Sequence, residues 1–96
     1  MLTGKQKRYL RSLANQEKAI FQVGKGGVNK NMIAQINDAL EKRELIKVNI
    51  LQNCEENKKD VAEQLKEGTD AEIVQIIGFN IVLYKESTEN KQIELP

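Results

Sequence analysis

AIFQVGKGGVNKNMIAQINDALEKRELIKVNIL, residues 19–51, contains two apolar runs on either side of a segment with helical periodicity. The first run, residues 19–23, predicts a strand that ends at the glycine-rich residues 24–27. From Asn29, which can cap a helix, to about Glu44, apolar side chains recur at helical spacing. Residues 45–51 then alternate as a second strand does. A strand, a helix and a strand in this order imply a right-handed crossover between parallel strands.

The residues before this unit predict a helix with one basic face. Thr3 and Gln6 match the capping-box pattern, so the helix begins there and runs to about Ala14. At 3.6 residues per turn, Leu2, Tyr9, Leu10 and Leu13 lie on the packing side, and Lys7, Arg8 and Arg11 lie opposite with Lys5 at the flank.

The residues after the unit predict a third helix and a hairpin. Asn53 and Glu56 form a second capping pair before a helix over about 55–67, which Gly68 ends. Two β-branched runs, residues 71–77 and 80–85, flank Gly78-Phe79, a pair typical of a two-residue type II′ turn. The polar residues 87–96 are expected to fray.

These elements give the order αβαβαββ. We expect an α/β fold of the α+β, two-layer type, with a four-stranded mixed sheet and helices. One domain over residues 1–86, followed by a polar tail over 87–96, is all that 96 residues accommodate.

The composition argues against several classes of protein. The chain has no histidine and a single cysteine, so it assembles neither a disulfide framework nor a histidine-dependent catalytic triad. Cys54 is expected to be a packing residue. No apolar run is long enough for a membrane span or follows the basic N-terminus as a signal peptide would. We therefore expect a cytoplasmic, monomeric binding protein with no catalytic residues, no metal, no cofactor and no membrane partner.

Charge is distributed unevenly along the chain. Residues 1–31 carry seven basic residues and one acidic residue, a net charge of +6, whereas the remainder has a net charge of −5. Such a split indicates an interaction with a polyanion, although basic residues also occur on helix faces that simply contact solvent.

The glycine-rich loop is the sharpest motif in the sequence. Glycines between a strand and a helix let a ligand approach the backbone, and Lys25 and Lys30 favour an anion such as phosphate there. Neither a P-loop nor a dinucleotide fingerprint fits, because Asn29 stands where each requires glycine and Asn31 replaces the P-loop hydroxyl. A GxxG nucleic-acid loop does fit, at Gly24 and Gly27. A tight strand-to-helix connection would also use these glycines.

Four blocks of residues carry a family resemblance. The four blocks are residues 2–11 (LTGKQKRYLR), 23–28 (VGKGGV), 39–48 (ALEKRELIKV) and 76–84 (IIGFNIVLY). On these blocks together, the chain resembles the CRM domain (chloroplast RNA splicing and ribosome maturation) in its bacterial stand-alone YhbY form, over about residues 1–86. The resemblance implies the order of elements given above and a fold similar to the C-terminal domain of translation initiation factor three. It also implies that the chain binds RNA without catalysis and associates with precursors of the large ribosomal subunit.

The candidate RNA-binding residues come from the loop, the first helix and the hairpin tip. Phe79 either stacks on a base or packs under the tail. An alternative function is a small nucleotide-binding or phosphotransfer protein that uses Lys25 and Lys30. A third is a protein-interaction module whose acidic third helix docks a basic partner. The candidate residues are Lys5, Lys7, Arg8, Arg11, Gly24, Lys25, Gly26, Gly27, Lys30 and Phe79.

Overall fold

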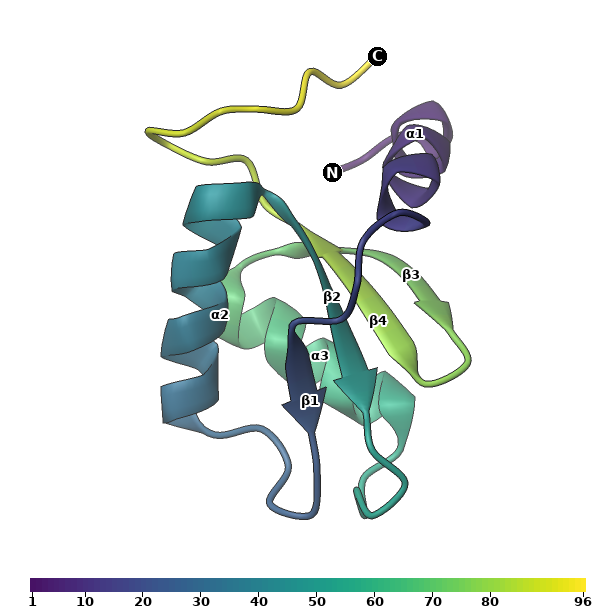
Figure 1. The fold of residues 1–96 in the computed structure, drawn as a ribbon, viewed down its shortest axis with the longest axis vertical. Helices are drawn as coiled ribbons and strands as arrows, with labels where there is room; N and C mark the ends of the chain where they lie inside the picture. Colours follow the sequence, from purple (N-terminus) through teal and green to yellow (C-terminus); the bar gives the residue numbers. More distant parts are fainter.

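The computed structural model describes residues 1–96 as three helices and a four-stranded sheet (Figure 1). The strands lie in the order β1-β2-β4-β3, with β1 parallel to β2 and the other two pairs antiparallel. The elements are α1 (Gly4–Ala14), β1 (Phe21–Val23), α2 (Lys30–Arg43), β2 (Leu45–Ile50), α3 (Lys58–Thr69), β3 (Glu72–Ile77) and β4 (Asn80–Tyr84). No helix is long and apolar enough to cross a membrane.

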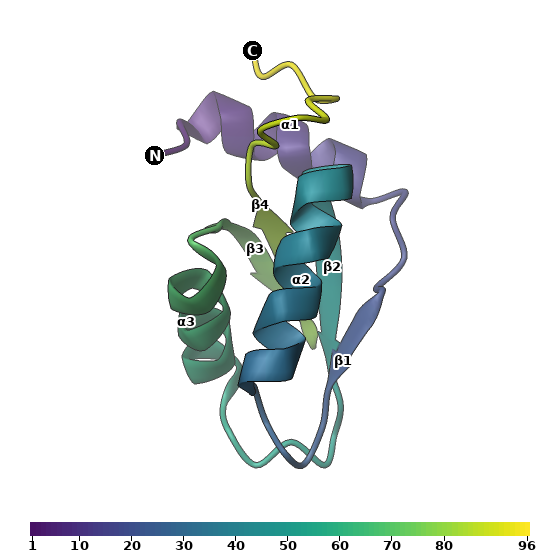
Figure 2. The same ribbon diagram turned by 90° about the vertical axis from the view of Figure 1, so that its left-hand side faces the viewer.

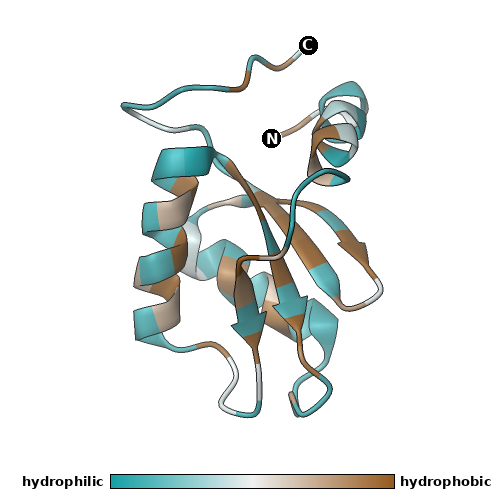
Figure 3. Cartoon of the chain, in the orientation of Figure 1, coloured by the Kyte–Doolittle hydropathy of each residue, from teal (hydrophilic) through white to brown (hydrophobic).

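The two central strands bury apolar side chains on both faces of the sheet. On β4, Ile81 and Leu83 join a cluster of twelve buried residues with α2 and α3, whereas Val82 and Tyr84 join a second cluster of six with α1. Successive side chains of a strand point to opposite faces, so the two clusters lie on opposite sides of the sheet. Figure 3 shows hydrophobic colouring on the strands of the sheet, β2 and β4 among them.

The order of elements and the mixed sheet confirm the prediction from the sequence. The two-layer description holds for the sheet with α2 and α3, while α1 adds a further layer over one end of the other face (Figures 1 and 2). The Thr3–Gln6 capping box and the Asn29 cap are present as predicted. Of the two turn residues between β3 and β4, only Gly78 has a positive φ, as a type II′ turn requires.

Three element boundaries differ from the prediction. Strand β1 is limited to three residues at the sheet edge. Helix α3 begins after Asn57, whose side chain accepts from the backbone N–H of Asp60, so the predicted cap at Asn53 was wrong. Gly68 does not end α3 but lies within it, and the left-handed Asp70 ends the helix instead.

The C-terminal tail (residues 87–96) also differs, because it does not fray. Glu41 and Glu44 at the end of α2 accept hydrogen bonds from its backbone N–H groups, and Ile93 and Leu95 pack against the α1 cluster. Figure 2 shows the tail running above α2 beside α1. Two apolar side chains among polar neighbours, together with distant carboxylates, hold a segment whose composition alone suggested no packing.

Candidate nucleic-acid interface

The GxxG loop (residues 24–27) connects the end of β1 to the start of α2. Strand β1 is parallel to β2, so both strands end at the same edge of the sheet and the loops that follow them are neighbours (Figure 1). The backbone N–H of Leu51 donates to the carbonyl of Val23 at 2.8 Å and joins the two strand ends. The β2–α3 loop (residues 51–57) therefore lies against the GxxG loop.

Several backbone N–H groups at this loop have no acceptor within the chain. The N–H of Gly27 donates to the carbonyl of Gly24 at 3.0 Å and closes the turn, and the Asn29 side chain accepts from the N–H of Met32. Helix N-termini attract anions because their first N–H groups are unpaired and the helix dipole is positive there. The geometry is suited to an oxyanion, and the unpaired N–H groups include those of Lys25, Gly26, Lys30 and Asn31.

Gly26 and Gly27, two of the three glycines of the loop, have different roles. Gly27 has a φ of +68°, and a Cβ there would collide with the carboxylate of Glu56 on the β2–α3 loop. Gly26 has open space around it and no positive φ, so it tolerates a side chain. Gly27 is thus needed for the shape of the loop, while Gly26 leaves its outer surface open to a ligand.

The candidate lysines and arginines carry uncompensated charge. The chain contains only two ion pairs, from the Met1 amino group to Glu72 and from Lys91 to Glu86. Lys25 and Lys30 are exposed beside the unpaired N–H groups. This edge therefore offers hydrogen-bond donors and positive charge to one ligand.

Helix α1 has the basic face that the sequence predicts, but this face lies far from the GxxG loop. Lys5, Arg8 and Arg11 are exposed and Lys7 is half-buried, whereas Leu10 is fully buried. The predicted packing side differs in one place, since Tyr9 keeps 39% of its surface exposed. Both views place α1 at the end of the molecule opposite the GxxG loop (Figures 1 and 2). The structure thus presents two separated basic regions rather than one.

Phe79 belongs to the edge that contains the loop. Its carbonyl accepts from the N–H of Ile50 at 2.6 Å, and the Asn49 side chain donates to the same carbonyl at 3.3 Å, so the hairpin tip is fixed to the end of β2. The tail contacts α1 and the end of α2 instead, so it does not cover this ring. Phe79 is 56% exposed, so the predicted packing under the tail is wrong, and base stacking stays a prediction.

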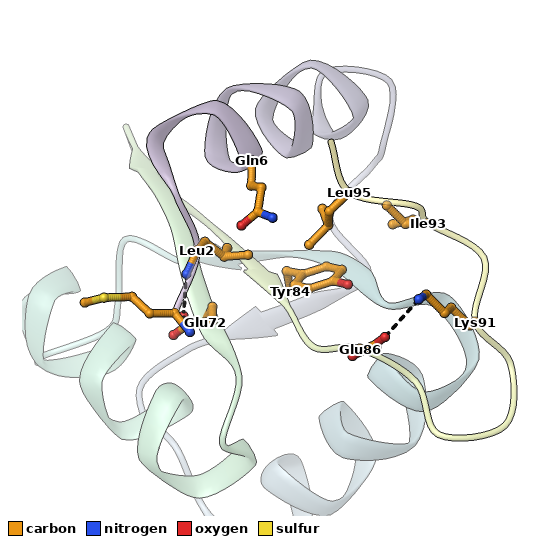
Figure 4. Close-up of a pocket in the computed structure, with 9 residues that line it drawn as sticks. Leu2, Gln6, Glu72, Tyr84, Glu86, Lys91, Ile93 and Leu95 are labelled. Atoms are coloured by element: carbon orange, nitrogen blue, oxygen red, sulfur yellow. Dashed lines mark hydrogen bonds and ion pairs between the residues drawn. The ribbon is translucent and has the colours of Figure 1, made fainter.

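The largest hollow, about 390 Å³, lies elsewhere, between α1, β4 and the tail (Figure 4). Its charged groups are already paired with each other: Glu72 accepts from the backbone N–H of Leu2 and lies near the N-terminal amine, and Lys91 faces Glu86 at 3.1 Å. The Tyr84 ring fills its floor, and burial raises the pKa of the Tyr84 hydroxyl. No cation is left there to hold a phosphate.

Two other observations bear on the alternative functions. The structure contains no group of three or more histidine, cysteine or acidic side chains that could hold a metal ion. Helix α3 is not acidic over its length, because Lys58, Lys59 and Lys66 match its three acidic residues in number. A basic partner would therefore meet a mixed surface.

Some residues of this edge were missed by the reasoning from sequence. Asn53, Glu56 and Lys58 lie beside the loop glycines and Phe79. The signal that could have found them is the parallel pairing of β1 and β2, because the carboxyl ends of adjacent parallel strands lie at the same edge of a sheet.

Comparison with known proteins identifies the family. The model of the CRS1 / YhbY (CRM) domain matches residues 2–85. The chain is 71% identical over 96 residues to the "Probable RNA-binding protein YqeI" of Bacillus subtilis (strain 168), with both proteins covered completely. It is 37% identical over 95 residues to an "RNA-binding protein" of Haemophilus influenzae, covering 99% of this chain and 95% of the other.

A solved structure agrees with the fold. The solution structure of the Staphylococcus aureus protein SAV1595 superposes with a TM-score of 0.83 at 66% identity, with both chains covered completely. The matched residues include the loop, the basic helix and the hairpin. The chain therefore belongs to the CRS1 / YhbY (CRM) domain family.

Proposed function

We propose that this chain binds structured RNA through its phosphate backbone, as a monomeric and non-catalytic factor in the assembly of the large ribosomal subunit. The GxxG loop and the start of α2 make the main contact, and the basic face of α1 makes a second. The observation that carries this proposal is the set of unpaired N–H groups beside two unpaired lysines, at Lys25, Gly26, Lys30 and Asn31.

The composition of the interface favours recognition of the backbone over reading of the base sequence. The chain has four aromatic residues, and among these only Phe79 belongs to this edge. Backbone amides, lysines and arginines contact phosphates, which fix position without specifying sequence. Relatives named RNA-binding proteins support RNA as the polyanion, and the resemblance to ribosome-maturation modules supports ribosomal RNA.

The alternative, a nucleotide-binding or phosphotransfer protein, lacks support at the same residues. The Asn29 side chain is occupied in capping α2, and Asn31 provides no hydroxyl for a magnesium ion. We expect the purified protein to hydrolyse neither ATP nor GTP. Hydrolysis that disappears in Lys30→Ala would favour this alternative.

Sedimentation of a cell lysate tests the proposed function. We expect the wild-type chain to sediment with large-subunit precursors and to be largely absent from translating ribosomes. Lys25→Asp combined with Gly26→Asp places two carboxylates at the phosphate site, so RNA affinity should fall about ten-fold or more, equivalent to about 1.4 kcal/mol. Both residues are exposed and Gly26 is unstrained, so the fold should survive.

The control is Glu63→Gln, which changes an exposed carboxylate on α3 that forms no ion pair and no hydrogen bond within the chain. It should sediment as the wild type does. If the wild-type chain remains entirely in the free fractions, or if the double variant sediments with precursors unchanged, the proposed role of the loop is wrong.

A further inference from the structure

A small apolar pocket lies between the β2–α3 loop and the hairpin tip, and one of its lining residues, Glu56, also lies against Gly27 of the GxxG loop. Its volume is about 250 Å³, and the end of β2, the β2–α3 loop and the hairpin tip form its walls. The lining is Ile50, Leu51, Gln52, Cys54, Glu56, Asn57, Lys58 and Phe79.

The size and lining of the pocket restrict what it can hold. Pockets for drug-sized ligands measure about 300–1,000 Å³, so this one suits a single ring system. Ile50 and Leu51 offer apolar surface, and the Gln52 side chain makes no hydrogen bond within the chain. An apolar slot with a free amide at its rim is suited to a flat heterocycle that has polar edges.

The Phe79 ring is held in position to stack. The Lys58 ammonium lies 5.4 Å from the ring centroid and donates to the Gly78 carbonyl at 2.7 Å. The backbone anchors to β2 hold the hairpin tip, and the cation–π contact favours one orientation of the ring before any ligand arrives. More than half of the surface of Phe79 is nevertheless exposed.

The pocket and the phosphate site share the β2–α3 loop. Asn53 Oδ1 lies 3.3 Å from the position that a Cβ on Gly24 would occupy, and Glu56 lines the pocket while its carboxylate lies against Gly27. The Gln64 side chain donates to Glu56 and holds that carboxylate between the two sites. A nucleotide with its phosphate on the GxxG loop therefore has this pocket as its neighbour.

We propose that the pocket binds one unpaired base of the RNA, stacked on Phe79, while the GxxG loop holds an adjacent phosphate. This inference rests on the proposed function and adds a preference for RNA with a bulged or looped-out base over fully paired RNA. Bases stack on aromatic side chains with little dependence on sequence, so the preference is for the unpaired state rather than for one base.

Binding of two matched RNAs tests the pocket. One is a stem with a single bulged purine and the other is the same stem without the bulge, both measured by fluorescence anisotropy. Phe79→Ala should weaken binding of the bulged RNA about five-fold or more and leave the paired RNA within about two-fold. Phe79→Tyr keeps the ring and should bind as the wild type does. Circular dichroism checks that each variant is folded.

The outcomes separate the pocket from the proposed function. If Phe79→Ala binds both RNAs as the wild type does, or weakens both equally, the base pocket is wrong. In that case Lys25→Asp with Gly26→Asp still tests the loop, and loss of binding to both RNAs supports phosphate recognition. If the wild-type chain binds neither RNA, the proposed function fails and the pocket with it.

Cys54 provides a second readout within the pocket, since it is the only thiol of the chain. Its reaction with 5,5′-dithiobis(2-nitrobenzoate) should slow when the bulged RNA is bound. The paired RNA, at the same occupancy, should leave the rate unchanged. Equal protection by both RNAs, or protection by neither, would overturn the proposal.

Discussion

Glu44 combines full burial with a backbone conformation that residues with side chains rarely adopt. Its φ is +65°, and its carboxylate accepts from the backbone N–H groups of Ser87, Gln92 and Ile93 at 2.7–2.8 Å. Its own carbonyl accepts from the N–H of Lys85. Burial acts to raise the pKa of Glu44, but the backbone donors outweigh it and the pKa is lowered. One side chain thus joins α2 to the whole tail.

Replacing this carboxylate should destabilise the protein. Glu44→Gln substitutes an amide N–H₂ for an oxygen that now faces a backbone donor, so we expect a loss of about 2 kcal/mol or more in the free energy of unfolding. Urea denaturation measures it. Glu89→Gln, an exposed change in the same tail, should cost less than about 0.5 kcal/mol. Equal stabilities for the two variants would contradict the assigned role of Glu44.

Glu41 makes the attachment of the tail sensitive to acid. The Ser87 hydroxyl, followed by the backbone N–H groups of Thr88 and Glu89, lowers the pKa of Glu41 from 4.5 to about 2. Between these values the unfolded chain binds the proton and the folded chain does not. Stability from this group is therefore present above about pH 4.5 and is lost as the pH falls towards 2.

A comparison of variants isolates this effect from the other carboxylates. The urea midpoint of the wild type should fall as the pH decreases from 5 to about 2.5, and Glu41→Gln should show a smaller fall over the same window. Glu63→Gln should keep the wild-type dependence. If Glu41→Gln loses as much stability as the wild type does, the hydrogen bonds of Glu41 to the tail contribute nothing.

At the scale of elements, Gly68 allows α2 and α3 to pack closely. A Cβ at this position would lie 2.5 Å from Ile33 Cδ1 and 3.0 Å from Ile33 Cγ1. Alanine is favoured over glycine in a helix by about 1 kcal/mol, whereas overpacking costs about 1–3 kcal/mol. Gly68→Ala should therefore lower stability despite its better helix propensity, as measured by urea denaturation.

Trimming the neighbour should reverse part of that loss. Ile33→Val removes Cδ1 and alone costs about 0.5–1.5 kcal/mol. Combined with Gly68→Ala, the two changes should cost less than the sum of the single effects, because they share one contact. A Gly68→Ala variant more stable than the wild type would show that the helices simply move apart.

The same glycine shows which parts of the fold the sequence could predict. Periodicity located every helix and strand, and the capping patterns at Thr3 and Asn29 set two helix starts within one residue. Asn53 and Asn57 each precede an acidic residue by three positions, as a capping residue does, and the structure uses Asn57, whose side chain accepts from the backbone N–H of Asp60. In the sequence, Gly68 resembles a residue that ends a helix, and only its contact with Ile33 explains why a glycine lies within α3. Local patterns fail where a distant contact determines the outcome.

For the candidate site, sequence could locate the loop but not its surroundings. The GxxG motif and Lys25 are visible in the sequence, and the strand before and helix after them are correct. The separation of α1 from the loop depends on which end of the sheet α1 covers. No local pattern specifies that end, because it follows from burial of Leu10 against Val82 and Tyr84.

At the scale of the whole molecule, the distance between the two basic regions predicts a dependence on RNA length. The longest axis measures 37 Å, and the two basic regions lie towards its opposite ends (Figure 1), so only a stem long enough to reach both ends can contact both at once. Arg8→Ala with Arg11→Ala should weaken binding to a stem of about two turns and leave a stem of about half a turn unaffected. On the long stem the slope of log K against log salt should decrease in magnitude by up to about 1.4–1.8.

The loop variant Lys25→Asp with Gly26→Asp provides the comparison, since it should weaken both stems. Measurements of affinity across a salt series check both expectations. If the α1 variant and the loop variant affect the short stem alike, the two regions do not bind separated phosphates.

The alternation of side chains on β4 also governs how the protein opens. Ile81 and Leu83 face one apolar cluster and Val82 and Tyr84 face the other, so neither cluster can come apart while β4 stays in register. The two halves of the interior are consequently one cooperative unit. Amide protons along β4 should exchange with deuterated water only through global unfolding, at rates set by the full stability, whereas those of the edge strand β1 exchange sooner.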